Sequence, residues 1–243
     1  MKIFVTGIGW VGAAGMGSGR GPVPLSLPPG NLPHISRRDI QEEPDPRFGR
    51  LDAFSRIGLA AVALALRDAG LGGWTQPRAV GVFAATTYGC LSTDVDYLAS
   101  VGAAPGLASP HLFAYTLPNV FLGEAAIRYG LTGPTVVVSD EKGHGTAALE
   151  SAADYVADSD VAALAGICDL ARPALLPERP AQRTGALFLV LERRPTLEPL
   201  GELTARANGR WGLDGADSLH ALAQRLCAGN KPDRSDRSSD GTS

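Results

Sequence analysis

The sequence has 243 residues, of which 44% are hydrophobic and 19% charged, and its net charge is −3. This composition is that of a globular protein with room for one large core or two small ones. It contains no basic stripe and no apolar run of transmembrane length, so neither nucleic acid nor a membrane is an expected partner. The three cysteines are far apart and fit no metal-ligand spacing, which favours a reduced, cytoplasmic protein without a metal site.

Strands and helices alternate through the first part of the chain. Residues 2–6 form a short β-rich run that ends at glycine and predicts a buried strand. Residues 15–49 are rich in glycine and proline and predict a long surface loop. Residues 50–69 are predominantly apolar and predict a buried helix, with Gly70 as its C-cap. The next predicted strand covers residues 80–85.

The same alternation continues towards the end of the chain. The predicted elements are a short helix at 93–100, a helix at 117–130, a strand at 135–139, a helix at 143–157, and strands at 161–166, 186–192 and 200–207. The β-branched run TVVVS (135–139) predicts a fully buried strand. We therefore expect an α/β fold in which a single sheet of mostly parallel strands lies between helix layers.

The final residues differ in composition from the rest. The segment GNKPDRSDRSSDGTS is small, polar and mixed in charge, so we expect a disordered tail at 229–243. The remaining residues 1–228 are expected to form one domain, with 15–49 as its long surface loop.

The first strand is followed by a glycine pattern that matches a dinucleotide-binding motif. Gly7, Gly9 and Gly12 fit G-x-G-x-x-G, in which glycines let the backbone approach a pyrophosphate at a helix N-terminus. Here the following residues are glycine and proline rather than a helix, and no Tyr-x-x-x-Lys motif is present. We therefore expect a strand that ends in a glycine-rich turn, and no cofactor.

Several stretches, in this order, resemble the β-ketoacyl synthases, the condensing enzymes of fatty-acid and polyketide assembly. They are VTGIGWV at the start, RLDAFSRIGLAAVALALRDAGL (50–71), VGVFAATTYGCL (80–91), SPHLFAYTLPN (109–119), AAIRYGLTGPTVVVS (125–139), SDVAALAG (159–166) and GALFLVLERR (185–194). The resemblance covers roughly residues 1–215. It implies a thiolase-like fold of two similar α/β halves, of which we expect this chain to supply the N-terminal half only.

The resemblance also locates the position of the family's nucleophilic cysteine, eight residues after Pro134. That position holds Lys142, in the loop formed by Asp140, Glu141, Lys142, Gly143, His144 and Gly145. The resemblance therefore implies no catalytic residue and a pseudoenzyme that does not condense acyl chains by itself. As an alternative, Lys142 acts as a Schiff-base nucleophile, but neighbouring Asp140 and Glu141 would keep its amine protonated.

The family pairs its sheets edge to edge, and TVVVS is the candidate edge. The resemblance thus implies a chain-length-factor-like partner of a full-length β-ketoacyl synthase, in a heterodimer that binds acyl carrier protein. Such a subunit shapes the acyl tunnel in polyketide, aryl polyene or fatty-acid biosynthesis. The residues assigned to the tunnel and interface are His111, Leu112, Phe113, Tyr115 and Leu117, for which the other interpretation is an ordinary core role.

Two other classes of function stay open. One is a free-standing enzyme, either an NAD(P)-dependent reductase that uses the glycine-rich turn or an acyl enzyme that depends on Lys142. The other is a homodimeric, inactive scaffold that binds acyl carrier protein through Arg128, Arg193 and Arg194.

Overall fold

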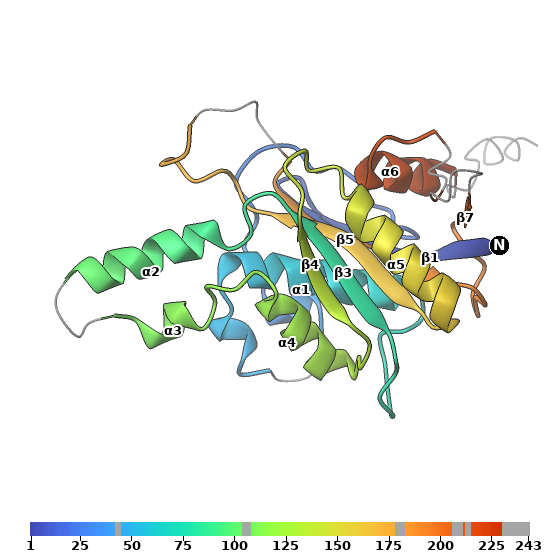
Figure 1. The fold of residues 1–243 in the computed structure, drawn as a ribbon, viewed down its shortest axis with the longest axis horizontal. Helices are drawn as coiled ribbons and strands as arrows, with labels where there is room; N and C mark the ends of the chain where they lie inside the picture. The colour runs from blue at the N-terminus through green and yellow to red at the C-terminus, as the bar shows by residue number, and fades with distance from the viewer. Residues whose placement is uncertain (42–44, 104–107, 178–182, 206–210, 212–214, 230–243) are drawn as a thin grey trace, which may run out of the picture.

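A computed structural model describes residues 1–41, 45–103, 108–177, 183–205, 211 and 215–229 of the chain. In these residues a seven-stranded sheet lies between two layers of helices (Figure 1). In chain order the elements are β1 (Lys2–Gly12), β2 (Gly15–Ser18), the 3₁₀ helices η1 (Arg37–Asp39) and η2 (Phe48–Arg50), α1 (Ala53–Asp68), β3 (Gly81–Thr86), α2 (Leu91–Ala103), α3 (Pro110–Phe113), α4 (Val120–Tyr129), β4 (Thr135–Ser139), α5 (Thr146–Ser159), β5 (Ala163–Asp169), β6 (Gly185–Glu192), β7 (Gly201–Thr204) and α6 (Leu219–Gly229).

The strand order is β2-β1-β6-β5-β3-β4, and β7 pairs with the first residues of β1. Among the described strands the parallel pairs are β3 with β4 and β3 with β5, whereas β6 is antiparallel to both β1 and β5. The predicted α/β class is confirmed, but its mostly parallel sheet is corrected to a mixed one. A parallel crossover requires a long, usually helical connection. The described part of the segment between β5 and β6 contains no helix, so β6 returns antiparallel beside β5.

Each face of the sheet has its own hydrophobic core. On one face α1 and α4 pack against the strands, and Phe121 of α4 makes edge-to-face ring contacts with Phe54 of α1 and Phe188 of β6. On the other face α5 and α6 pack through alanine and leucine side chains such as Leu149 and Leu222. The long helix predicted at 50–69 is confirmed as α1, which is buried along nearly its whole length.

The glycines of the G-x-G-x-x-G pattern lie inside a strand, not in a turn. β1 continues to Gly12, because its ladder with β6 extends to that residue. Gly7 and Gly9 allow α1 to pack directly on the strand backbone. A Cβ atom at Gly9 would lie 2.2 Å from the backbone nitrogen of Ala65, and one at Gly7 would lie 2.4 Å from the carbonyl oxygen of Ala65. The predicted end of the strand at glycine is therefore wrong, and the space that a pyrophosphate would need is filled by helix.

Residues 15–49, predicted to be a long surface loop, follow the surface but are anchored at several points. They contain β2, η1 and η2, and Asp68 of α1 accepts hydrogen bonds from the backbone N–H groups of Ile8 and Arg20. The buried anchors are Leu25, Leu27, Ile35, Ile40 and Phe48. These side chains explain why a segment so rich in glycine and proline keeps a defined path.

The strand TVVVS lies at the edge of the sheet, as expected, but it is not fully buried. β3 is its partner on one side, no described strand pairs with its other side, and its three valines are half-buried. A continuous β-branched run does not distinguish a central strand from an edge strand. At the other end, Gly229 is the last residue of α6 rather than the start of a tail, and the rest of the predicted tail lies outside the described residues.

Candidate functional site

The turn between β4 and α5 carries the residue at the predicted nucleophile position. Its glycines Gly143 and Gly145 have φ angles of 62° and 72°, so the backbone turns sharply into the helix. The carboxylate of Asp140 closes the turn, because it accepts hydrogen bonds from the backbone N–H of Lys142 at 3.1 Å and of Gly145 at 2.6 Å. We call residues 140–145 the elbow.

A second carboxylate holds the neighbouring turn after β3. Asp169, the last residue of β5, accepts hydrogen bonds from the Thr86 hydroxyl at 2.9 Å and from the backbone N–H groups of Thr87 and Tyr88 at 2.7 and 3.1 Å. Burial raises the pKa of the Asp169 carboxyl above its usual value, although these donors oppose the shift. The Thr87 hydroxyl in turn donates to the carbonyl oxygen of Asp140 at 3.0 Å. The ends of β3, β4 and β5 are thus joined through hydrogen bonds.

A cavity of about 410 Å³ lies beside the elbow. Its lining residues are Leu27, Pro29, Thr87, Lys142, Gly143, Ile167, Asp169, Arg183 and Gly185. The lining combines two cationic side chains, one buried carboxylate and several apolar side chains. Leu27 and Pro29 come from the long segment before α1, so that segment forms part of the site.

Helix α6 packs against the other side of the elbow. The backbone N–H of Leu219 donates to the carbonyl oxygen of His144 at 2.8 Å, and a Cβ at Gly145 would lie 3.0 Å from that of Leu219. Next to it, His220 is 93% buried, and its Nε2 has no hydrogen-bond partner among the described residues. Burial, together with the nearby charge of Arg183, lowers the pKa of His220 to about 4, so its imidazole is neutral at pH 7.

Residues 39–175 match the family model described as the N-terminal domain of β-ketoacyl synthases. The chain belongs to the β-ketoacyl synthase family. No curated protein matches the chain.

Solved structures confirm the thiolase-like fold that the sequence predicted. The ishigamide ketosynthase/chain length factor superposes with a TM-score of 0.61 at 20% identity, over 84% of this chain and 66% of that one. A second similar structure is AntDE:AntF, a type II polyketide synthase acyl-carrier protein in complex with its ketosynthase bound to the hexaketide. It superposes with a TM-score of 0.62 at 21% identity, over 84% of this chain and 68% of that one. The ketosynthase ApeO in complex with its chain length factor ApeC from Xenorhabdus doucetiae superposes with a TM-score of 0.57 at 15% identity, over 82% of each chain. This chain therefore spans about two thirds of the first of these proteins.

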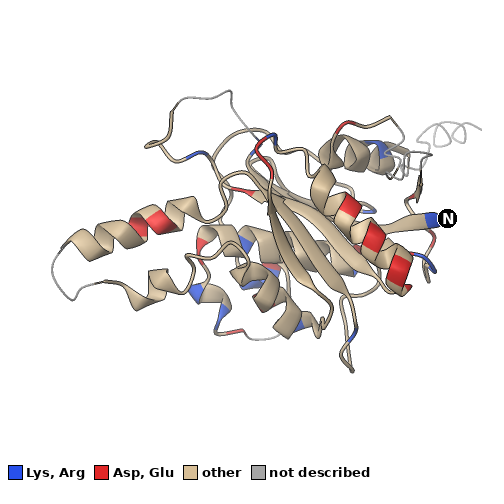
Figure 2. Cartoon of the chain, viewed as in Figure 1, with Lys and Arg blue, Asp and Glu red and all other residues tan. Residues whose placement is uncertain are grey.

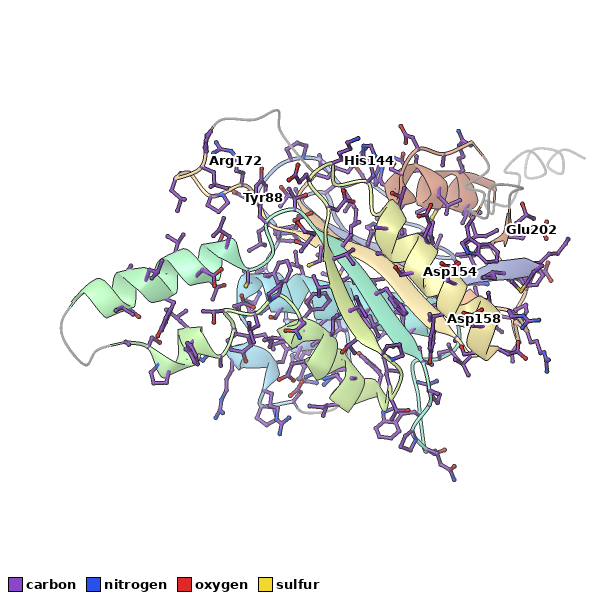
Figure 3. The ribbon with its side chains drawn as sticks, viewed as in Figure 1. Tyr88, His144, Asp154, Asp158, Arg172 and Glu202 are labelled. Atoms are coloured by element: carbon purple, nitrogen blue, oxygen red, sulfur yellow. The ribbon has the colours of Figure 1, made fainter. Side chains whose placement is uncertain are left out.

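In this β-ketoacyl synthase family member the predicted elbow residues differ in what they contact. Asp140, Lys142 and Gly145 meet in the turn as described, and the Lys142 side chain reaches the cavity. Glu141 is exposed and does not line the cavity, and His144 takes part through its backbone carbonyl. Figure 3 shows His144 and Tyr88 at the same end of the sheet, where β3 and β4 end.

Sequence reasoning did not single out three further residues of the site: Thr87, Asp169 and Arg183. Asp169 had a usable signal, because it ends a buried strand parallel to β3, and the carboxyl ends of parallel strands meet at one edge of a sheet. Arg183 had none, because it lies just before β6, and the direction of β6 was not predicted.

The predicted tunnel residues gather on a unit formed by α2, α3 and the turn after α3, which projects from the sheet in Figure 1. Tyr115 is buried and its ring contacts that of His111, with centroids 5.5 Å apart. Phe113 contacts Tyr97 of α2 but is 62% exposed, as is Leu117, whereas Leu112 is half-buried. None of the five lines the elbow cavity, so their tunnel role stays a prediction.

Other candidate chemistry in this chain is weak. Burial and the neighbouring Asp94 raise the pKa of the Cys90 thiol to about 12, and burial raises the pKa of Cys168 well above its usual value. Neither thiol is therefore a ready nucleophile. Within the described residues there is no group of His, Cys, Asp or Glu side chains suited to a metal ion, and no helix long and apolar enough to cross a membrane.

The arginines assigned to a carrier-protein scaffold are engaged within the chain. Arg128 forms an ion pair with Asp45, and its side chain is 12% exposed. Arg193 and Arg194 both pair with Asp160, at 3.5 and 2.8 Å. Arg128 is thus largely buried, whereas the Arg194 side chain remains 83% exposed beside Asp160.

Proposed function

We propose that this chain is a non-catalytic, chain-length-factor-like partner of a full-length β-ketoacyl synthase. The main observation behind the proposal is the structure of the elbow. Lys142 lies at the nucleophile position, and its backbone N–H is already hydrogen-bonded to the carboxylate of Asp140. Acyl transfer requires an activated nucleophile and free N–H donors for the oxyanion. Here the N–H of Lys142 already donates to Asp140, and the buried thiols of Cys90 and Cys168 have raised pKa values.

The edge strand supports the partner role. Val82 donates its N–H to the carbonyl of Pro134, and the N–H of Asp140 donates to the carbonyl of Thr86, so these two positions of the β4 segment face β3. Because backbone groups of successive strand residues point to opposite sides, Thr135, Val137 and Ser139 face away from β3. A row of unpaired donors and acceptors is a template for a strand of another chain.

The surface near this edge is apolar and poor in charge. Figure 2 shows few charged residues on α3, α4 and β4, in contrast to the acidic face of α5. The exposed large apolar side chains of α2, α3, α4 and the turn after α3 are Leu98, Val101, Phe113, Leu117 and Ile127. A surface of this kind is typical of a protein interface. In the heterodimer, the unit of α2 and α3 reaches towards the partner and contributes to the wall of its acyl tunnel.

Two of the similar structures support this assembly by their composition. One holds a ketosynthase with its chain length factor, and another holds an acyl-carrier protein with its ketosynthase. We infer that this chain acts in the same setting, the cytoplasmic biosynthesis of a polyketide, polyene or fatty acid on acyl carrier protein. It needs no cofactor of its own there.

The test is co-expression with a full-length ketosynthase from the same organism, followed by size-exclusion chromatography with mass analysis. We expect a stable one-to-one complex, and poor solubility when this chain is expressed alone. A soluble monomer or homodimer that does not bind the synthase would contradict the proposal. An active condensation assay of this chain alone, with the Lys142→Ala variant inactive, would favour the acyl-enzyme alternative instead.

A further inference from the structure

The elbow cavity contains two cationic side chains without a counter-ion. Neither Lys142 nor Arg183 forms an ion pair or a side-chain hydrogen bond within the part of the chain that the structure describes. Most other cationic side chains are engaged, for example Arg20 with Asp68 and Arg172 with the carbonyl of Leu176. Two like charges in one cavity raise its potential and attract an anion.

The acids near the cavity do not neutralise these cations. Asp140 is held by the backbone N–H groups of Lys142 and Gly145. Asp169 lines the cavity, but one of its oxygens accepts three hydrogen bonds from the turn after β3. Even with Asp169 ionised, the lining residues that the structure describes carry one net positive charge. The planar guanidinium of Arg183 is suited to two parallel hydrogen bonds with a carboxylate or phosphate.

The rest of the lining is apolar and compact. Leu27, Pro29 and Ile167 supply side-chain carbon, and Gly143 and Gly185 line the cavity without any side chain. A volume of about 410 Å³ falls within the range of small-ligand sites. The lining thus has a cationic part and an apolar part, which complement a ligand with an anionic head and a short apolar body.

We propose that the elbow cavity binds a small ligand through an oxyanion, either a carboxylate or a phosphate, held by Lys142 and Arg183. The short apolar body of the ligand packs against Leu27, Pro29 and Ile167. The residues named for the site all come from this chain, and the proposal does not depend on the partner role proposed above. It gives Lys142 a binding function at the position where the resemblance implied no catalytic residue.

The experiment uses three matched probes on the full chain, in whichever form it is purified: butyrate, butyl phosphate and the neutral butyramide. Binding is followed by titration calorimetry and by ligand-observed NMR. We expect one or both anions to bind and butyramide to bind at least about tenfold more weakly, because charge-assisted hydrogen bonds contribute more than neutral ones. The stronger anion identifies the head group as carboxylate or phosphate. Equal binding of butyramide would overturn the proposal, as would the absence of binding by either anion.

Substitutions locate the site. Arg183→Gln and Lys142→Gln are each expected to weaken anion binding about tenfold, and to reduce its dependence on salt concentration. Arg38→Gln is the matched control, since Arg38 is also exposed and lines a separate surface cavity near Trp74. Both cavity residues are exposed, so their variants should keep the thermal unfolding midpoint of the parent. Unchanged binding in Arg183→Gln, or an equal loss in Arg38→Gln, would contradict the assignment while leaving heterodimer formation untouched.

Discussion

Two carboxylates do most of the positioning at the site, and each holds a different turn. Asp140 shapes the elbow from within, and Asp169 fixes the turn after β3 from the end of β5. Thr87 connects them through its hydroxyl. The elbow was located from the sequence because the resemblance supplied a reference point at Pro134, whereas Asp169 depends on strand pairing that local patterns do not encode.

The protonation of His220 is coupled to the stability of the fold. Its pKa is about 4 in the folded protein against 6.5 for an ordinary histidine, so between these values the unfolded chain binds a proton that the folded chain does not. The free energy of unfolding is therefore highest above pH 6.5 and falls as the pH decreases towards 4. Between pH 7.5 and 5 we expect a loss of about 2 kcal/mol from this group.

Denaturant unfolding at the two pH values measures this loss. His220→Leu should reduce the difference between pH 7.5 and 5 by about the same amount, and His34→Leu, at an exposed position, should leave it unchanged. A His220→Leu variant with the full pH dependence of the parent would show that other groups are responsible.

At the level of elements, the glycines of β1 show that the G-x-G-x-x-G pattern occurs in two different structures, a dinucleotide site and a strand packed against a helix. In both, glycine removes a side chain so that another group approaches the backbone. In a dinucleotide site that group is a pyrophosphate, and here it is α1. We expect Gly9→Ala to lower the free energy of unfolding by about 3 kcal/mol or more, because the new methyl group would overlap the backbone of α1.

The matched control is Gly123→Ala in α4, where a Cβ meets no atom within 4 Å. This substitution should stabilise the chain by about 0.5–1 kcal/mol through helix propensity. Thermal or denaturant unfolding distinguishes the two variants. If Gly9→Ala were as stable as the parent, the close approach of α1 to β1 would have to be abandoned.

The predicted helices and strands were found wherever hydrophobic periodicity was strong, as in α1, β3, β4 and β6. The elements not predicted lack such a pattern or are short. β2 is the sequence GMGS, which forms a strand because it pairs with β1, and α3 has four residues. The type of each element could therefore be predicted from the local sequence. The antiparallel placement of β6 could not, because it depends on which strands of the sheet are available to pair with it.

The unit of α2 and α3 carries the predicted tunnel residues, and Leu112 provides its test. Leu112→Trp adds bulk to a half-buried position on α3. If α3 contributes to the tunnel wall, the product of the co-purified ketosynthase complex should become shorter by at least one extension unit, as measured by mass spectrometry. Size-exclusion chromatography confirms that the complex still forms. Unchanged products from an intact complex would place Leu112 outside the tunnel.

For the whole molecule, the open edge of β4 predicts how the chain would join the proposed ketosynthase partner. Val137→Pro removes a backbone donor that faces away from β3 and is expected to weaken the heterodimer at least about tenfold. Its effect on the stability of the chain alone should stay near 1 kcal/mol, since proline is tolerated on edge strands. Co-purification and analytical ultracentrifugation measure the affinity.

Thr135→Val is the control for Val137→Pro, because it alters an exposed side chain on the same strand and keeps every backbone donor. We expect it to bind the partner as the parent does. A Val137→Pro variant that still forms the full complex would mean that the partner docks elsewhere, for instance on α2 and α3 alone.

The position of β6 has a consequence for how the chain acquires its structure. β6 lies between β1 and β5, so the longest ladder of β1 pairs with residues that are synthesised well over a hundred positions later. Until β6 emerges from the ribosome, the apolar strand IFVTGIGWV lacks its main partner. Pairing across so large a sequence separation is slow and exposes strand edges meanwhile. Insertion of β6 is therefore the step that joins β1 to the rest of the sheet and ends the exposure of these strand edges.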